Sequence, residues 1–367
     1  MNTKTLILCL MLSAVSRNCA VGESQNDNKS NPNSENSIVF NGWYHSGKEK
    51  WQGTIHNKML FTWFTAVTTA SSEAEYKKLV SYQRQNGVKY IGYYYSSTTS
   101  APQKPLEYPE GTIPNDAIKP SWVVRDRAGT PVTWPGQEHR FYLDVGIRQV
   151  QEAILERAIK NAKSLGANVL FLDNWSYKSF APGNLQEQQW AQKCLSLLIR
   201  ARELSMQNNI KLVVNLSSPV ESWVEFATYL DGIAYEMAAH PNRLKTRDLY
   251  ELELSSYEKV LAMGKSIFLY TDTLTHNGRR WDEDGRKVAA TAMLVMPEVQ
   301  PYWGGIYVAN PRYEVWPVGG WALWPEQLGK PSGPRKWEGN TVTRNFEHGS
   351  IAVTAGDQPK FSVTINY

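Results

Sequence analysis

Residues 168–175, Asn168-Val-Leu-Phe-Leu-Asp-Asn-Trp175, form a short apolar run that ends in a carboxylate, Asp173. A second stretch of this kind, Asp231-Gly-Ile-Ala-Tyr-Glu-Met237, follows two strand–helix units later and carries Glu236 near its end. Short apolar runs of this length predict buried strands. Strands that alternate with helices predict a parallel sheet or barrel, in which polar groups at the carboxyl ends of the strands gather at one rim. Both carboxylates are therefore expected at that rim.

The same alternation extends along most of the chain and defines the predicted fold. Nearly every predicted strand is followed by a segment with helical periodicity, and eight such units are the count of a (β/α)₈ barrel. The fold class expected for residues 38–318 is therefore α/β, a (β/α)₈ TIM barrel. The eight predicted strands are 58–66, 88–95, 139–144, 168–173, 210–215, 232–236, 266–272 and 302–308.

The two ends of the chain differ from this middle part. Residues 319–367 begin Pro/Gly/Trp-rich and then alternate with period two, which predicts a small C-terminal β-element packed on the barrel. Residues 1–22 combine a cationic start with an apolar run too short to span a membrane, so we expect a signal peptide. Residues 23–37 have almost nothing to bury and predict a disordered linker. Secretion, or a cell-surface or periplasmic location, follows. Lipidation of Cys19 is the weaker alternative, because Ser-Arg-Asn before it is a poor lipobox.

Composition excludes several classes of function. The net charge is +4 with no basic run, so nucleic acid is not an expected partner. Scattered histidines and the absence of nucleotide-binding glycine motifs predict neither a metal nor a cofactor. The 14 Trp, 19 Tyr and 10 Phe are the outlier. Aromatic rings pack cores and also stack on sugar rings in ligand clefts. A carbohydrate partner is expected, and the oligomeric state stays open.

Two carboxylates at one rim are the groups that cleave a glycosidic bond. Asp173 would attack the anomeric carbon or stabilise an oxocarbenium-like transition state, and Glu236 would act as general acid/base. Asp173 as a helix cap, and Glu236 as the ion-pair partner of Arg243 or Lys245, are the alternatives. Asp144 and Asp272 end other predicted strands and are alternative carboxylates.

Several stretches resemble a superfamily of barrel glycoside hydrolases that includes the endo-α-1,4-polygalactosaminidases. The stretches are Trp122-Val-Val-Arg-Asp-Arg-Ala-Gly-Thr-Pro131, Phe141-Tyr-Leu-Asp144, Asn168-Val-Leu-Phe-Leu-Asp-Asn174 and Arg344-Asn-Phe-Glu-His-Gly-Ser-Ile-Ala-Val353. The resemblance implies a catalytic pair at the ends of strands four and six, the positions used by the retaining α-galactosidase and α-glucosidase clan. It thus implies Asp173 and Glu236 as the pair, and the retaining mechanism rests on it alone.

A wider set of residues is expected to bind substrate because they are polar or aromatic and follow predicted strands. Arg312 would suit an acidic sugar, since its fork matches a carboxylate. Trp63, Trp303 and Trp316 are further aromatic candidates. The full predicted set is Asp144, Trp175, Tyr95, Tyr93, Asn215, Asp272, Asn310, Arg312, Trp43 and Tyr235.

The sequence therefore predicts a secreted glycoside hydrolase that acts on a polysaccharide or glycoconjugate. One alternative is a carbohydrate-binding barrel without activity. Another is a polysaccharide lyase on the same fold, for which Tyr270 or His240 would be the base. A deacetylase would need an Asp/His metal set that the sequence does not show. The glycan, its linkage and endo or exo action stay open.

Overall fold

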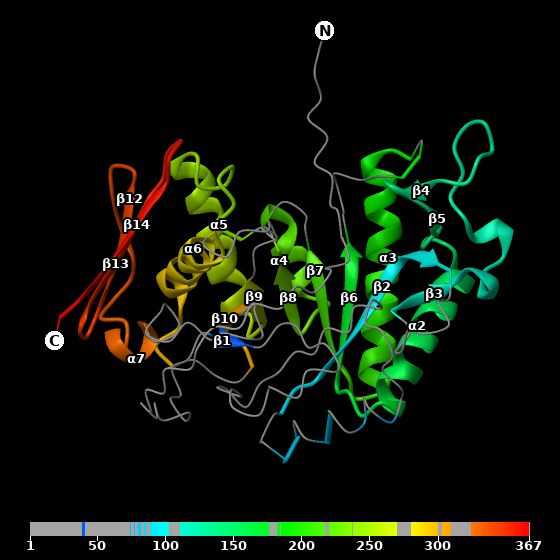
Figure 1. Ribbon diagram of the computed structural model, residues 1–367, viewed down its shortest axis with the longest axis horizontal. Helices are drawn as coiled ribbons and strands as arrows, with labels where there is room; N and C mark the ends of the chain where they lie inside the picture. The colour runs from blue at the N-terminus through cyan, green and yellow to red at the C-terminus, as the bar shows by residue number, and fades with distance from the viewer. Residues whose placement is uncertain are drawn as a thin grey trace, which may run out of the picture.

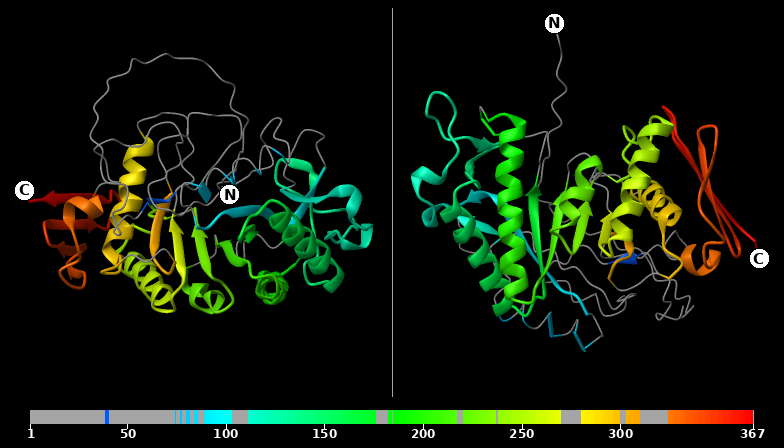
Figure 2. Two further views of the ribbon diagram at one scale, coloured as in Figure 1. Left: turned by 90° about the horizontal axis from the view of Figure 1, so that it is seen from below. Right: turned by 180° about the vertical axis from the view of Figure 1, so that it is seen from behind.

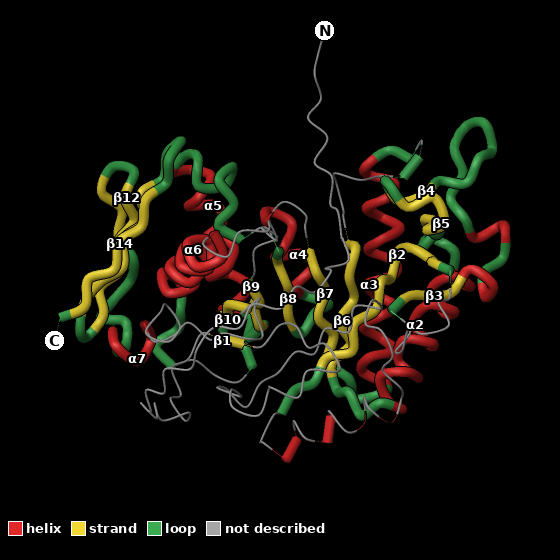
Figure 3. The backbone as a smooth tube through the Cα atoms, in the orientation of Figure 1, coloured by secondary structure: helices red, strands yellow, loops and turns green. Residues whose placement is uncertain are grey.

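The computed structural model describes residues 39–40, positions within 74–85, 89–102, 111–175, 182–183, 185–216, 220–236, 238–269, 280–299, 303–309 and 324–366. Within these ranges the chain forms one large, mostly parallel sheet with helices along one face, and a smaller antiparallel sheet near the C-terminus (Figure 1). From β5 to β10 strands and helices alternate along the chain, and Figure 3 shows the two kinds of element by colour. The α/β class predicted from the sequence is confirmed.

The large sheet has the strand order β1-β10-β9-β8-β7-β6-β2-β5-β4, with β3 also paired to β2. All neighbouring pairs from β1 to β2 are parallel. The strands that carry the site are therefore neighbours and end at the same edge. The strand bounds are β1 Val39–Phe40, β2 Gly92–Ala101, β3 Thr112–Pro114, β4 Thr133–Trp134, β5 Gln137–Tyr142, β6 Val169–Trp175, β7 Lys211–Leu216, β8 Gly232–Tyr235, β9 Ser266–Leu269 and β10 Ile306–Ala309.

Helices cover the outer face of this sheet, and the views of Figure 2 show them together on that side. Alternation along each strand divides the core into two parts. Leu170 and Leu172 of β6 belong to the larger outer core, whereas Val169 and Phe171 belong to a small inner core with Tyr94. The helices are α2 Arg148–Ser164, α3 Glu187–Gln207, α4 Trp223–Ala227, α5 Arg247–Ala262, α6 Arg280–Val295 and α7 Trp324–Leu328.

One predicted strand takes a different place. The sequence predicts 139–144 as the third parallel strand, but the structure shows β5 antiparallel to β2, and β2 pairs directly with β6. Two features explain this. A Pro135-Gly136 turn, with Gly136 at φ 76°, folds β4 and β5 into a hairpin. In addition, β2 continues to Ala101, so its first half pairs with β6 and its second half with β5.

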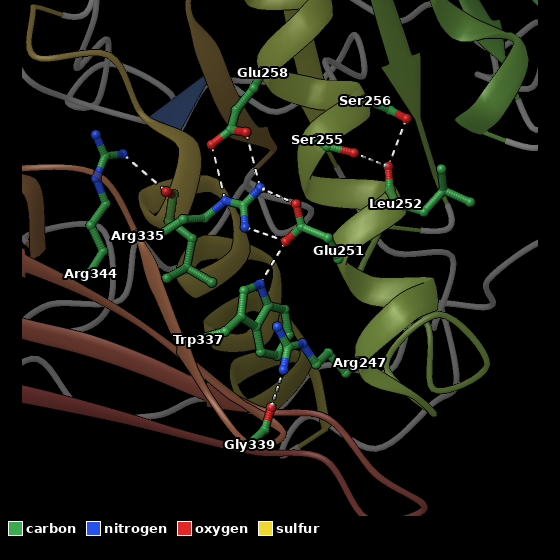
Figure 4. Close-up of polar contacts among 11 residues, drawn as sticks. Arg247, Glu251, Leu252, Ser255, Ser256, Glu258, Arg335, Trp337, Gly339 and Arg344 are labelled. Atoms are coloured by element: carbon green, nitrogen blue, oxygen red, sulfur yellow. Dashed lines mark hydrogen bonds and ion pairs between the residues drawn. The ribbon is translucent and has the colours of Figure 1, made fainter.

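The C-terminal sheet has the order β11-β12-β13-β14, with β11 Lys336–Glu338, β12 Thr341–Phe346, β13 Gly349–Thr354 and β14 Lys360–Ile365. It is fastened to α5 by polar contacts (Figure 4). Arg335 bonds both Glu251 and Glu258 of that helix. Trp337 Nε1 donates to Glu251 at 2.6 Å. Arg344 donates to three carbonyls around the end of α6, among them that of Met296 at 2.7 Å.

Some sequence predictions lie outside the described residues. They include the signal peptide at 1–22, the linker at 23–37 and the strand at 58–66. Among the helices that the structure does describe, none is long and apolar enough to cross a membrane.

Candidate active site

Three neighbouring strands bring polar side chains to one edge of the sheet. Asp173 lies near the end of β6, Asn215 near the end of β7, and Glu236 directly after β8. Because β6, β7 and β8 are adjacent and parallel, their carboxyl ends meet at one rim. The structure thus brings together Asp173, Glu236 and Asn215, three residues that the sequence places on separate strands.

Asp173 is held by two hydrogen-bond donors. Its side chain is buried, and its Oδ2 accepts a 2.6 Å hydrogen bond from the Tyr94 hydroxyl. Its Oδ1 accepts a 2.8 Å bond from Asn215 Nδ2. The Ser97 hydroxyl also donates to the Asp173 main-chain carbonyl at 3.1 Å. Two donors, one on each oxygen, therefore fix the orientation of this carboxyl group.

Asn215 links the two acids. Its Nδ2 donates to Asp173 Oδ1 at 2.8 Å and to Glu236 Oε2 at 3.1 Å, which together limit the separation of those two oxygens to less than about 5.9 Å. Asn215 Oδ1 is buried, and no hydrogen bond to it is found in the described part of the chain. Glu236 itself is half-buried.

Tyr94 is the contact that the predicted residue set misses. The sequence set names Tyr93 and Tyr95, but alternation turns those two toward the helices, where they are buried in the outer core. The Tyr93 hydroxyl there accepts a 3.2 Å bond from Asn161 of α2. Burial and the neighbouring Asp173 charge raise the pKa of Tyr94 well above its usual value, so its hydroxyl stays a donor.

Tyr235 is also turned away from the carboxylates. Its ring meets the Trp223 ring edge to face, with centroids 4.8 Å apart, within the outer core. Trp303 precedes β10 and packs on Phe268, at the opposite end of the strands from the rim. The structure brings neither residue to the carboxylates, because one faces the helices and the other the amino ends of the strands.

Asp144 takes a structural role in the described contacts. Its Oδ1 accepts a 2.7 Å ion-pair bond from Lys193 of α3 and a 3.1 Å bond from the Gly146 amide. His240 is half-buried, and its Nδ1 accepts from the Asn242 amide at 3.2 Å. Trp175 is the last residue of β6, and its side chain is outside what the structure describes. The positions outside the described residues are Trp43, Trp63, Tyr270, Asp272, Asn310, Arg312 and Trp316.

A third acid lies behind the loop that carries Glu236. Glu253 of α5 is fully buried; its Oε1 accepts from the Tyr257 hydroxyl at 2.5 Å and from the Ala239 amide at 3.4 Å. Ala239 has a positive φ of 52°, rare for a residue with a Cβ. Burial raises the pKa of Glu253 to about 7, against the lowering effect of the Tyr257 hydrogen bond. The loop after β8 is therefore hydrogen-bonded, through the Ala239 amide, to a carboxyl group whose pKa is close to neutral pH.

The described residues contain no group of three or more His, Cys, Asp or Glu placed to hold a metal ion. The arrangement at the rim has two carboxyl groups that share an amide donor, and a tyrosine hydroxyl bonded to one of them. These groups have the chemistry for nucleophilic attack and proton transfer.

The fold follows the TIM-barrel plan, and a family match gives the class of protein, a glycoside hydrolase. A family model described as hypothetical glycosyl hydrolase family 15 matches residues 76–350. The chain belongs to this family, and its activity is hydrolysis of O-glycosyl bonds. This confirms the enzyme class predicted from the sequence.

Solved structures resemble the chain in fold. A cyclomaltodextrinase has 11% identity and a TM-score of 0.51, with 90% of this chain and 69% of that chain covered. A noncanonic maltogenic α-amylase, AmyB from Thermotoga neapolitana, has 10% identity and a TM-score of 0.50, with 91% and 99% covered. The glycoside hydrolase domain of PelA from Pseudomonas aeruginosa has 14% identity and a TM-score of 0.45, with 76% and 96% covered. No curated protein matches the chain in sequence.

Proposed function

We propose that the protein is a retaining glycoside hydrolase in which Asp173 is the nucleophile and Glu236 the general acid/base. The observation that carries the proposal is the shared Asn215 amide, whose bonds of 2.8 Å and 3.1 Å span the two carboxylates. A separation of about 5 to 5.5 Å is typical of retaining enzymes, whereas inverting enzymes keep about 6.5 to 9.5 Å for a water molecule. The upper limit of about 5.9 Å between the two oxygens bonded to Asn215 lies below the inverting range and supports the first class.

In the first half of the reaction the glycosidic bond breaks. Glu236 gives its proton to the leaving oxygen, while an oxygen of Asp173 attacks the anomeric carbon and forms a covalent glycosyl ester. The Tyr94 and Asn215 donors hold the Asp173 carboxylate in one orientation for this attack. Such positioning lowers the entropic cost of the attack, because the carboxylate is already oriented.

In the second half the ester is hydrolysed. Glu236, now ionised, takes a proton from a water molecule, which attacks the same carbon and releases Asp173. Two inversions at one carbon restore the original configuration. Asn215 bonds both acids through one nitrogen, so it can stabilise negative charge on Asp173 before attack and on Glu236 after it.

The substrate we propose is a polysaccharide or glycoconjugate met outside the cytoplasm. The apolar N-terminal segment of signal-peptide length supports export, as does the polar stretch that follows it. Substrate contacts predicted at Trp43, Asp272, Asn310 and Arg312 belong to this proposal.

The test is a screen of the purified protein against polysaccharides and aryl glycosides, with Glu236→Gln in parallel. The first product released from an active substrate is then examined by proton NMR. Release of the retained anomer supports the mechanism, and release of the inverted anomer contradicts it. Glycan binding without hydrolysis would indicate a carbohydrate-binding barrel instead, and an unsaturated product would indicate a lyase.

A further inference from the structure

Arg140 of β5 lies beside the site, and none of its side-chain hydrogen bonds within the described residues goes to an acid. Its Nε donates to Thr99 Oγ1 at 2.8 Å, and its Nη2 donates to Ser96 Oγ at 2.9 Å. Both hydroxyls are buried and lie 3.0 Å from each other. The guanidinium also stacks over the Trp134 ring at 4.6 Å from its centroid. Two hydrogen bonds and a ring therefore fix the plane of a half-buried cation.

This cation is close to the catalytic acids. Ser96, which it bonds, is the register partner of Asp173 across the β2–β6 pair. Its charge also acts on the Tyr94 hydroxyl, where it opposes the rise of the Tyr94 pKa caused by burial and Asp173. Arg140 is thus positioned at the Asp173 side of the rim, with β2 lying between its strand and β6.

Two half-buried arginines of the described chain, Arg200 and Arg335, have their charge matched by acids. A third, Arg344, donates to main-chain carbonyls around the end of α6. Arg140 has neither kind of partner among the described residues. Arg200 bonds Glu152 and Glu203, and Arg335 bonds Glu251 and Glu258. Within the described ranges, the hydrogen bonds of Arg140 go only to neutral hydroxyls. A guanidinium has five N–H donors, so three remain on its Nη1–Nη2 edge. That edge matches the two oxygens of a carboxylate or sulfate.

We propose that Arg140 forms a subsite for an anionic sugar, binding the carboxylate of a uronic acid or a sulfate ester next to the scissile bond. The inference rests on the proposed function for the position of the bond, and it names the class of glycan that the site takes. Taking a cation partly out of water is unfavourable until an anion pairs with it. The substrate supplies that anion and completes the ion pair.

Binding is measured by titration calorimetry, so the result does not depend on hydrolysis. The probes are oligogalacturonate, oligomannuronate and an unsulfated glucuronan oligosaccharide, each beside its methyl ester, and a sulfated galactan oligosaccharide beside its desulfated form. Each pair differs only in the charged group. The proteins are wild type, Arg140→Gln, Arg140→Lys and Arg125→Gln. Arg125 is exposed and lies in the segment that precedes β4, and its Nη1 donates to the Gly129 carbonyl. The Arg125→Gln variant is the control, because it also loses one positive charge, but at a position outside the rim.

Wild type should bind at least one anionic probe about ten- to a hundredfold more tightly than its neutral counterpart, the range expected for a charge-assisted bond. Arg140→Gln should abolish the difference, Arg125→Gln should keep it, and Arg140→Lys should keep part of it. The uronate and sulfate pairs distinguish the two anions. Raising NaCl from 50 to 500 mM should weaken anionic binding by wild type and leave the neutral probes unchanged.

The inference is overturned if no anionic probe binds better than its neutral counterpart, or if Arg140→Gln keeps the preference. If Arg140→Gln does not fold, Arg140→Lys and the salt dependence decide the question. Charge-selective binding without cleavage would contradict the proposed function and support this inference. Cleavage restricted to neutral glycans would support the proposed function and contradict this inference.

Discussion

Among the acid pairs of the described chain that share one nitrogen-bearing side chain, two have linkers that differ in charge. At the rim, Asp173 and Glu236 share the neutral Asn215 amide. At the C-terminal sheet, Glu251 and Glu258 share the cationic Arg335 (Figure 4). A cation neutralises its acids and fixes them as structural groups. A neutral amide orients them and leaves their charge available, as the catalytic roles proposed for Asp173 and Glu236 require.

The largest effect is expected from neutralising one acid of each pair. Asp173→Asn should reduce kcat/KM by more than ~10³-fold, because the nucleophile is lost. Glu251→Gln, the matched change at the other pair, should leave activity within about twofold of wild type. Initial rates and circular dichroism spectra of both variants test this. Equal losses in the two variants would remove the distinction.

Removing the neutral linker should have the next largest effect. Asn215→Leu keeps similar bulk but leaves the two carboxylates without a shared donor, and we expect kcat to fall about 10²-fold. The loss should appear in kcat more than in KM, since the amide acts on the developing and vanishing charges. Steady-state kinetics with an aryl glycoside measures the split. A kcat within threefold of wild type would show that the amide link is not needed.

A buried acid without a bonded cation among the described residues gives a third case, Glu253, on which only the more distant charge of Arg243 acts. Its pKa is raised to about 7 in the folded protein, above the ordinary value of 4.5. The folded state therefore binds more protons between these values, and stability falls as pH rises from about 4.5 to 7. Glu253→Gln keeps the acceptor for the Ala239 amide and should remove this fall.

Chemical unfolding at pH 5 and pH 8 tests the prediction for Glu253. Wild type should lose about 2 kcal/mol relative to Glu253→Gln between the two pH values. Tyr257→Phe is a useful companion, because it removes the hydroxyl that bonds Glu253 at 2.5 Å. Parallel pH profiles for wild type and Glu253→Gln would contradict the assignment.

The smallest effect is expected at the cationic linker. Arg335→Gln removes a side chain that is 9% exposed, while its partners Glu251 and Glu258 are 40% and 44% exposed. Because those partners reach solvent, unfolding should become easier by only about 1 to 2 kcal/mol. Specific activity of the folded variant should not change. A loss of activity without a loss of stability would tie the C-terminal sheet to catalysis.

The parallel sheet and the position of the two acids follow from patterns that the sequence contains. Residues 168–175 and 231–237 are apolar runs that end in acids, and parallel strands place such ends at one rim. The sequence also shows that Tyr94 must point to the opposite face of its strand from Tyr93 and Tyr95, because side chains alternate along a strand. Either Tyr94 or the other two tyrosines therefore face the site. The predicted set contains Tyr93 and Tyr95 instead of Tyr94, because three consecutive tyrosines do not reveal which face of the strand is turned toward the site.

Contacts between distant segments could not be predicted in the same way. The polar run 96–100 looks like a loop, yet it is the buried second half of β2, and its hydroxyls bond Arg140 from β5. The antiparallel position of β5 depends on a Pro-Gly turn inside a region that composition marks as a loop. Asp144 ends a predicted strand as Asp173 does, but Lys193 of α3 pairs with it. Such pairings depend on tertiary geometry.

The central claim, that Asp173 is the nucleophile of a retaining pair, is tested most directly by trapping the ester. Glu236→Gln is mixed with a dinitrophenyl glycoside of the active sugar, whose leaving group needs no acid. The quenched protein is then mapped by mass spectrometry. The account predicts one glycosyl unit on Asp173, because the missing base slows ester hydrolysis. A glycosyl unit on another carboxylate, or turnover with no covalent intermediate and an inverted product, would contradict it.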